Sequence, residues 1–192
     1  MYIADTTTLI EPFGIDLDLE RGIMQNPGHH LKRHASDMRG YYKDEEALEK
    51  LIQEHHDPLH YEVFETPVPK EDGHLMYCIS TLQPGLVGNE CFMTKGHYHA
   101  RVNTGEIYLC LRGVGYMVMK REDGECRYEK MVRGNMVYVP PYWAHRSVNT
   151  GTQEPLISFC VYPADCGYNY GDIEKEGFPK RIFNENGAIK IL

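Results

Sequence analysis

The sequence predicts an all-β fold, either a closed barrel or a sandwich, for a chain of 192 residues. Short strand-like runs recur along most of the chain, and Gly, Pro and Asn turns separate them. Only one stretch has the apolar spacing of an amphipathic helix. Hydrophobic residues make up 42% of the composition, which is enough to form a core. The length suits a single domain.

The strand-like runs begin at residues 61–65, where polar and apolar side chains alternate. Residues 75–82 form a short apolar run that stops at Pro84 and Gly85. Asp123 and Gly124 predict a hairpin turn between two later runs. The remaining strands are expected at 90–94, 106–111, 115–120, 127–132, 136–139 and 156–162.

One helix is expected over residues 45–54, with Asp44 as its N-cap. Ala47, Leu48, Leu51 and Ile52 form one apolar stripe, which we expect to pack on the outside of the barrel. Residues 1–43 contain several glycine and proline breaks. They predict an N-terminal extension packed on the barrel, with the barrel itself at 44–192 in a single domain.

Composition and charge exclude some classes of function. The formal net charge is -8 and no block of Lys and Arg occurs, so we expect no nucleic-acid partner. No apolar run approaches the ~18 residues of a membrane span, and the polar start predicts no signal peptide. The six cysteines form no CxxC pair and lie mostly in apolar runs. We therefore expect free thiols and a reducing cytoplasm, rather than disulfides or a thiolate zinc site.

A group of metal-ligating residues occupies two blocks of the sequence. His97 and His99 follow Gly96, and side chains two apart on a strand point to the same face. Glu106 is expected to start a strand beside theirs, and His145 follows a Pro-Pro turn. Three imidazoles and one carboxylate suit Fe(II), Mn, Zn, Ni or Co better than Ca or Mg. Four protein ligands leave coordination positions open for substrate, which is typical of catalytic sites.

The other histidines lie in polar or loop-like stretches, and we expect none of them to bind metal. They are His29, His30, His34, His55, His56, His60 and His74.

The two blocks resemble the two motifs of the cupins, small β-barrels that hold a metal in the mouth of the barrel. They are more closely similar to the cupin-type glucose-6-phosphate isomerases of archaea and some bacteria. The similarity runs from about Glu11 to near the C-terminus. It rests on Ser36-Asp37-Met38, Ser80, Pro84, Gly88, Thr94-Lys95-Gly96-His97, His99, Glu106, Tyr108, Pro140-Pro141, His145, Asn149 and Tyr162-Pro163-Ala164-Asp165.

The resemblance implies a jelly-roll cupin barrel with one or two short helices, and a cytoplasmic homodimer of glycolysis and gluconeogenesis. It implies an enzyme that interconverts glucose 6-phosphate and fructose 6-phosphate with one divalent metal per subunit, Fe(II) being the first expectation. The implied metal ligands are His97, His99, Glu106 and His145. The implied substrate-binding residues are Tyr61, Ser80, Thr94, Gly96, Tyr162 and Tyr170, with Tyr108 beside them. Tyr162, Tyr168 and Tyr170 also offer phenolic donors, which we expect to bind phosphate. Ser80 stands where the family often has Thr, and Tyr168 where it tends to have His.

The chemistry of an aldose–ketose isomerisation fits these residues. Glu106 is the only acid in the motifs and therefore the candidate base, and Tyr108 shares its strand face and could donate a hydrogen bond. Proton transfer through an enediol and direct hydride shift both remain open. Thr94 and the backbone N–H of Gly96 are expected to hold phosphate, and Lys95 alternates away from them.

Two other functions remain open at this point. An Fe(II)-dependent cupin dioxygenase would use the same ligand set, with a pocket less rich in hydroxyl groups. A non-catalytic sugar-binding cupin is the second alternative, although such proteins often lose ligands and this chain keeps all four. The sequence leaves open the use of mannose 6-phosphate, the native metal and the working temperature.

Overall fold

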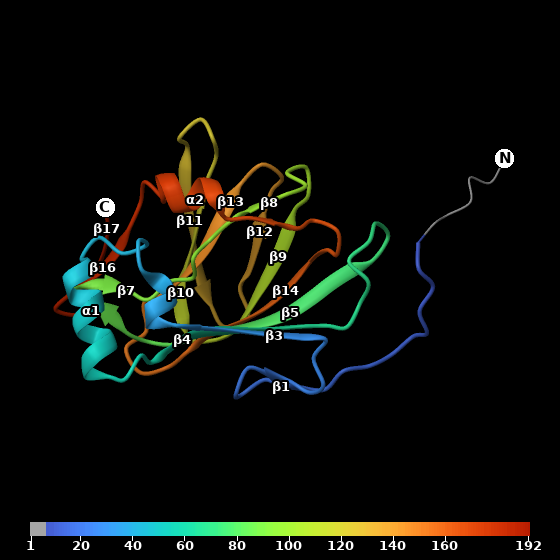
Figure 1. Cartoon of the computed structure of the whole chain (residues 1–192), viewed down its shortest axis with the longest axis horizontal. Coiled ribbons are helices and arrows are strands. Elements are labelled where there is room, and N and C mark those ends of the chain that lie inside the picture. Colours follow the sequence, from blue (N-terminus) through green and yellow to red (C-terminus); the bar gives the residue numbers. More distant parts are fainter. Residues whose placement is uncertain (1–6) are drawn as a thin grey trace.

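A computed structural model describes residues 7–192 and is dominated by β-strands (Figure 1). The long strands are β3 (His29–His34), β4 (Leu59–Glu65), β5 (Leu75–Leu82), β9 (Glu106–Arg112), β10 (Val114–Lys120), β11 (Cys126–Val132), β12 (Met136–Val139), β13 (Ala144–Asn149), β14 (Leu156–Pro163), β16 (Ile182–Glu185) and β17 (Ala188–Ile191). The two-residue strands are β1 (Leu17–Asp18), β2 (Ile23–Met24), β6 (Leu86–Val87), β7 (Glu90–Cys91), β8 (Tyr98–His99) and β15 (Tyr168–Asn169). The helices are η1 (Ala35–Met38), α1 (Glu45–Glu54) and α2 (Gly171–Glu176).

Two sheets face one another across the core. The larger has six strands in the order β12-β9-β14-β5-β4-β3, and the smaller has three in the order β11-β10-β13. Met76 and Cys110 of the larger sheet and Met117 and Met131 of the smaller one belong to one buried apolar cluster. Side chains point alternately to the two faces of a strand, so the two inner faces supply one continuous core. The sheets fit a jelly roll, and the expected all-β fold is confirmed.

Helix α1 begins and ends where the sequence predicts. The Asp44 side chain accepts a hydrogen bond from the Ala47 backbone N–H at 2.9 Å, which satisfies one free donor of the first turn. Leu48 is fully buried, and α1 packs against η1 and β6. Figure 1 shows α1 beside the four-stranded sheet β17-β16-β7-β6. The predicted position on the outside of the barrel is therefore confirmed.

The hairpin predicted at Asp123 and Gly124 joins β10 to β11. Lys120 pairs with Cys126, and Gly124 has a φ of +86°, a left-handed conformation that glycine adopts at little cost. The regular pairing continues to Val114 and Val132, so this turn sets the register of the whole hairpin.

Two expectations about the strands and one about a histidine need correction. The strand expected at 90–94 ends at Cys91, and Met93 pairs with Val148 only as an isolated bridge. Residues 144–149, not expected as a strand, form β13, in which all six residues are buried. The sequence does not predict this strand because one of its faces lines a cavity and carries polar side chains, such as His145 and Ser147, in place of an apolar alternation. His60 lies in β4, not in a polar loop; it is fully buried, and its Nε2 lies 2.8 Å from the Tyr42 hydroxyl.

The N-terminal segment is integrated with the larger sheet. Strand β3 pairs with β4 along its length, and the β1–β2 hairpin packs apolar side chains on the outer face of that sheet. Residues 1–6 of the expected extension lie outside the described residues, and the division at residue 43 stays a prediction.

The six cysteines are free thiols, as expected. Within residues 7–192, no helix combines the length and the apolar character that crossing a bilayer requires.

Candidate metal centre and pocket

The four residues expected to bind metal lie together in one buried group. The ligand atoms of His97, His99, Glu106 and His145 all fall within 4.8 Å of one another. Glu106 Oε2 lies 3.1 Å from His99 Nε2 and 3.0 Å from His145 Nε2. His99, Glu106 and His145 are at most 5% exposed. Such a group of three imidazoles and one carboxylate could hold a divalent transition metal.

The two sheets supply different parts of this group. His97 and His145 are paired by a backbone bridge, with N–H···O bonds of 3.2 and 3.1 Å in both directions, so β13 fixes their spacing. Glu106 is the first residue of β9, whose neighbours are β12 and β14. The strand of Glu106 was expected beside that of the histidines, and this expectation is wrong because β8 pairs with β15 instead. The carboxylate reaches the imidazoles across the interior.

Hydrogen bonds behind the group orient two of the imidazoles. His99 Nδ1 lies 2.8 Å from Thr104 Oγ1, and that hydroxyl donates to the Arg101 carbonyl at 2.6 Å. The Thr104 oxygen must therefore accept the Nδ1 proton, which leaves the lone pair of His99 on Nε2. His145 Nδ1 lies 3.5 Å from the Trp143 carbonyl oxygen. A proton on this Nδ1 likewise leaves the lone pair of His145 on Nε2.

The unsatisfied atoms fit a cation better than a hydrogen-bond network. His97 Nε2 is buried and, among the described residues, has no hydrogen-bond partner. An unpaired nitrogen in this position is costly without a ligand. Desolvation, followed by the nearby His145, places the pKa of His97 well below its ordinary value, so its imidazole is neutral. Neutral imidazoles are the form that binds metal.

Glu106 is ionised throughout the physiological range. Burial alone would raise its pKa, but the close contacts with His145 and His99 outweigh burial and lower the pKa to about 2. Tyr108 behaves oppositely, because desolvation and then the Glu106 charge raise its pKa well above the ordinary value. The site therefore pairs a permanent carboxylate with a phenol that keeps its proton.

A cavity of about 340 Å³ opens beside these residues. Glu106, Tyr108 and every residue expected to bind substrate line it: Tyr61, Ser80, Thr94, Gly96, Tyr162, Tyr168 and Tyr170. Of the four candidate metal ligands, His99 alone is absent from its wall. The lining carries many hydroxyl groups, and the volume lies in the range of small-molecule sites.

Gly96 is required by its surroundings. Its φ is +78°, and a Cβ atom there would lie 2.7 Å from the Phe178 ring and 3.0 Å from the His145 carbonyl. Lys95 points away from the cavity, as expected, and its ammonium lies 4.8 Å from the centre of the Tyr41 ring. Thr94 Oγ1 accepts the Ser147 backbone N–H at 3.1 Å, so its hydroxyl proton is available to a ligand.

Sequence reasoning missed half of the lining. The missed residues are His29, Leu31, Arg33, Val63, Glu65, Lys70, Cys78, Arg146, Ser147 and Cys160. Strand alternation could have found several of them, since Val63 and Glu65 follow Tyr61 at a spacing of two, and Cys78 and Cys160 precede Ser80 and Tyr162 at the same spacing. Arg33 carried no local signal, because its contact with the cavity depends on the pairing of β3 with β4.

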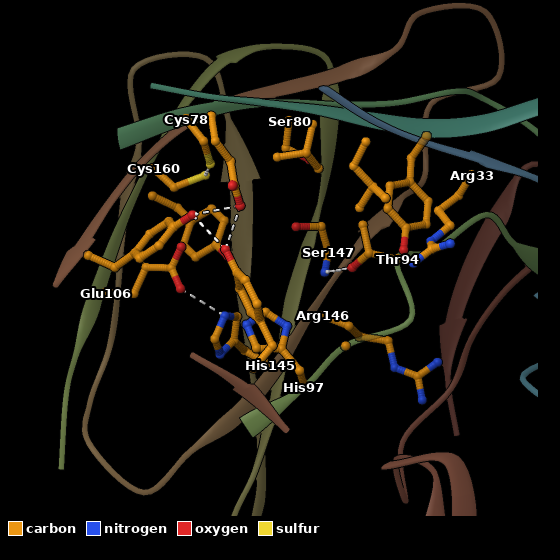
Figure 2. A pocket seen from close by; sticks show the side chains of 18 of the residues that line it. Arg33, Cys78, Ser80, Thr94, His97, Glu106, His145, Arg146, Ser147 and Cys160 are labelled. Atoms are coloured by element: carbon orange, nitrogen blue, oxygen red, sulfur yellow. Dashed lines mark hydrogen bonds and ion pairs between the residues drawn. The ribbon is translucent and has the colours of Figure 1, made fainter. Parts of the chain in front are cut away.

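The two ends of the cavity differ in charge. Figure 2 shows Glu106, His97 and His145 on one side, and Arg33 with Thr94 on the other. Arg33 Nε is buried and, within the described part of the chain, makes no hydrogen bond. This nitrogen is a hydrogen-bond donor without a partner, and an anionic ligand could accept its hydrogen bond.

These features define the chain as a cupin-type protein, a jelly-roll β-fold with a candidate metal centre beside a hydroxyl-rich cavity. Residues 32–191 match the family model of glucose-6-phosphate isomerase (GPI). The glucose-6-phosphate isomerase of Thermococcus litoralis is 46% identical over 181 residues, 94% of each chain. That of Thermococcus gammatolerans is 48% identical over 182 residues, again 94% of each. The chain belongs to the glucose-6-phosphate isomerase family.

Two further comparisons give more distant similarity. A putative glucose-6-phosphate isomerase 2 of Rhizobium meliloti is 36% identical over 181 residues, 94% of this chain and 90% of the relative. A solved oxalate oxidase is 13% identical, with a TM-score of 0.49 over 59% of this chain and 56% of its own.

Proposed function

We propose that this chain interconverts glucose 6-phosphate and fructose 6-phosphate in the cavity beside the His97, His99, Glu106 and His145 group. The proposal of this reaction rests on family membership over nearly the whole chain. The buried group within 4.8 Å supports the position of the reacting centre. The dioxygenase and the non-catalytic sugar-binding alternatives are not favoured by the relatives, and the wall of the cavity is rich in hydroxyl groups.

The metal that this group would hold is proposed to be Fe(II), with Mn, Zn, Ni and Co as the other candidates. When bound, the metal would stabilise negative charge on the sugar oxygens during the reaction. His99 and His145, held through their Nδ1 atoms, direct Nε2 toward the centre. The chain thus fixes ligand direction through its own hydrogen bonds.

Glu106 and Tyr108 are proposed as the catalytic side chains. Glu106 supplies the only carboxylate among the proposed ligands, and it is ionised, so it can accept a proton or hold a hydroxyl group of the substrate. Tyr108 lies two residues further along β9 and keeps its phenolic proton, so it can donate to a substrate oxygen. Its ring lies 5.7 Å from that of His145.

The phosphate group is proposed to bind at the opposite end of the cavity. Arg33 offers an unsatisfied guanidinium nitrogen, and Thr94 offers a hydroxyl proton. Gly96 lines the cavity, and its backbone can approach a ligand closely because the residue has no side chain of its own. A sugar held between the two ends would present its carbon chain to the metal centre.

We further propose a cytoplasmic homodimer. Strand β12 lies at an edge of the six-stranded sheet, and Ile107, Met136 and Tyr138 on β9 and β12 are 47%, 70% and 59% exposed. Three large exposed apolar side chains on adjoining strands favour burial against another copy. Analytical ultracentrifugation of the wild type and of Met136→Lys tests the dimer.

The proposed reaction is tested by following glucose 6-phosphate formation from fructose 6-phosphate. Activity should disappear on complete chelation and return on addition of a divalent metal, with Fe(II) tested against Mn, Zn, Ni and Co. Glu106→Gln should reduce turnover by about 10²- to 10⁴-fold while the circular dichroism spectrum is unchanged. Full activity in metal-free protein would contradict the role of the metal.

A further inference from the structure

A second carboxylate lies in the cavity wall, and the proposed reaction does not use it. Glu65 ends β4, on the same face as Tyr61 and Val63, and its side chain is only 7% exposed. Its Oε1 lies 2.7 Å from the Tyr168 hydroxyl and 3.4 Å from the Tyr162 hydroxyl. The two hydroxyls lie 2.7 Å apart. All three side chains line the cavity.

The short contacts fix the direction of the two phenolic protons. A carboxylate accepts only, so Tyr168 must donate to Glu65 in the 2.7 Å contact. Its single proton is then used, and Tyr162 must be the donor in the contact between the two phenols. The protons therefore run from Tyr162 to Tyr168 to Glu65, and neither is left to donate to a ligand in the cavity.

The carboxylate is held ionised by its own contacts. Burial would raise the pKa of Glu65, but hydrogen bonds from Tyr168 and Lys70 lower it below the ordinary value. Lys70 Nζ lies 3.0 Å from Oε2, and His29 Nδ1 lies 3.5 Å from the same oxygen. Both side chains are more than half exposed, so the inner side of the wall keeps its hydrogen-bond acceptors.

This wall adjoins the candidate metal centre. The Tyr168 ring lies 4.9 Å from the His97 ring, and the Tyr162 ring lies 6.2 Å from the His99 ring. A ligand beside the metal centre would therefore meet the lone pairs of the two phenolic oxygens.

We propose that Glu65 is a positioning residue, which turns the Tyr162 and Tyr168 protons away from the cavity so that this wall accepts hydrogen bonds from the hydroxyl groups of the sugar. The proposal rests on the proposed isomerase function and deepens it. A wall that offers only lone pairs of phenolic oxygens disfavours a phosphate group, for which the Arg33 end is proposed. The expectation that Tyr162 and Tyr168 act as phosphate donors is replaced by this role.

The test separates the polyol part of a ligand from its phosphate. The variants are Glu65→Gln, Tyr168→Phe and the double variant, and Glu62→Gln serves as the matched control. Glu62 lies on the same strand, but its carboxylate pairs with His30, and it is not part of the cavity wall. Binding of glucitol 6-phosphate and of inorganic phosphate is measured by calorimetry, and KM and kcat are measured with fructose 6-phosphate.

Each single variant should weaken glucitol 6-phosphate binding and raise KM by about tenfold, as expected for hydrogen bonds that depend on a charged group. Inorganic phosphate should bind within about twofold of the wild type, and kcat should stay within about threefold. The double variant should lose little more than either single variant, because the two residues act as one chain. Glu62→Gln should leave all of these values unchanged.

Equal losses for glucitol 6-phosphate and inorganic phosphate would overturn the proposal, as would unchanged binding or fully additive losses. Tyr168→Phe removes a single hydroxyl, so it keeps the test valid if Glu65→Gln fails to fold. A wild type that binds glucitol 6-phosphate without isomerase activity would refute the proposed function. In that case the binding measurements still decide the role of Glu65.

Discussion

The two ends of the cavity are built on different principles. At the metal end, three of the four candidate ligands are at most 5% exposed, and hydrogen bonds to Thr104 and within the backbone hold the imidazoles in place. At the other end, the Arg33 side chain is 31% exposed, and Nη1 reaches Asp37 only at 3.9 Å. The metal end is thus arranged before any ligand arrives. The cationic end is completed by its ligand, so substitutions at the two ends should have different signatures.

The largest effect is expected at the metal end. His97→Ala removes a buried nitrogen that has no hydrogen-bond partner in residues 7–192. It should remove most of the bound metal and reduce isomerase activity at least about 10³-fold, because a three-ligand group binds metal more weakly and with altered geometry. Elemental analysis of the purified variant measures the metal content. His55→Ala, at the exposed end of α1, is the control. Metal content equal to that of the wild type would remove His97 from the ligand set.

A smaller effect is expected from the support behind the ligands. Thr104→Val keeps the shape of the side chain but removes the acceptor for His99 Nδ1. Metal affinity should fall about 10- to 100-fold while the fold is retained. Competition with a calibrated chelator measures the change. An unchanged metal affinity would contradict the view that this hydrogen bond holds His99 in position for the metal.

The cationic end should show a different pattern. Arg33→Gln should raise both KM for fructose 6-phosphate and the inhibition constant of inorganic phosphate about tenfold, with metal content unchanged. Lys32→Ala is the matched control, since Lys32 is exposed and adjacent on β3. A loss of metal in Arg33→Gln would show that the two ends are not independent.

The smallest effect is expected in the acid stability of metal-free protein. The folded pKa of Glu106 is about 2, below its ordinary value of 4.5, so the ionised carboxylate contributes stability above about pH 4.5. That contribution should be lost as the pH falls from about 4.5 to about 2. Thermal unfolding of the chelated wild type should therefore decline more steeply in this window than that of Glu106→Gln. Parallel curves would contradict the lowered pKa.

The sequence was informative where chemistry and local periodicity coincide. His97 and His99 are two apart on an extended segment, and the Asp123-Gly124 turn and the Asp44 cap act over a few residues. The fold class and helix α1 follow from such local signals. The carboxylate of Glu65 and the hydroxyl of Tyr168 come from positions 103 residues apart, so no local pattern could join them. Strand β13 was missed because a strand that faces a polar cavity loses its apolar alternation.

The origin of the four ligands has a consequence for heat resistance. Glu106 comes from the six-stranded sheet, whereas the backbone bridge attaches His97 to His145 on the three-stranded one. An ion bound by all of them would cross-link the two layers of the molecule at a single point. Since binding to the folded state alone stabilises that state by mass action, about 2.7 kcal/mol at a hundredfold excess over the dissociation constant, the supply of metal would set the melting temperature as well as the rate.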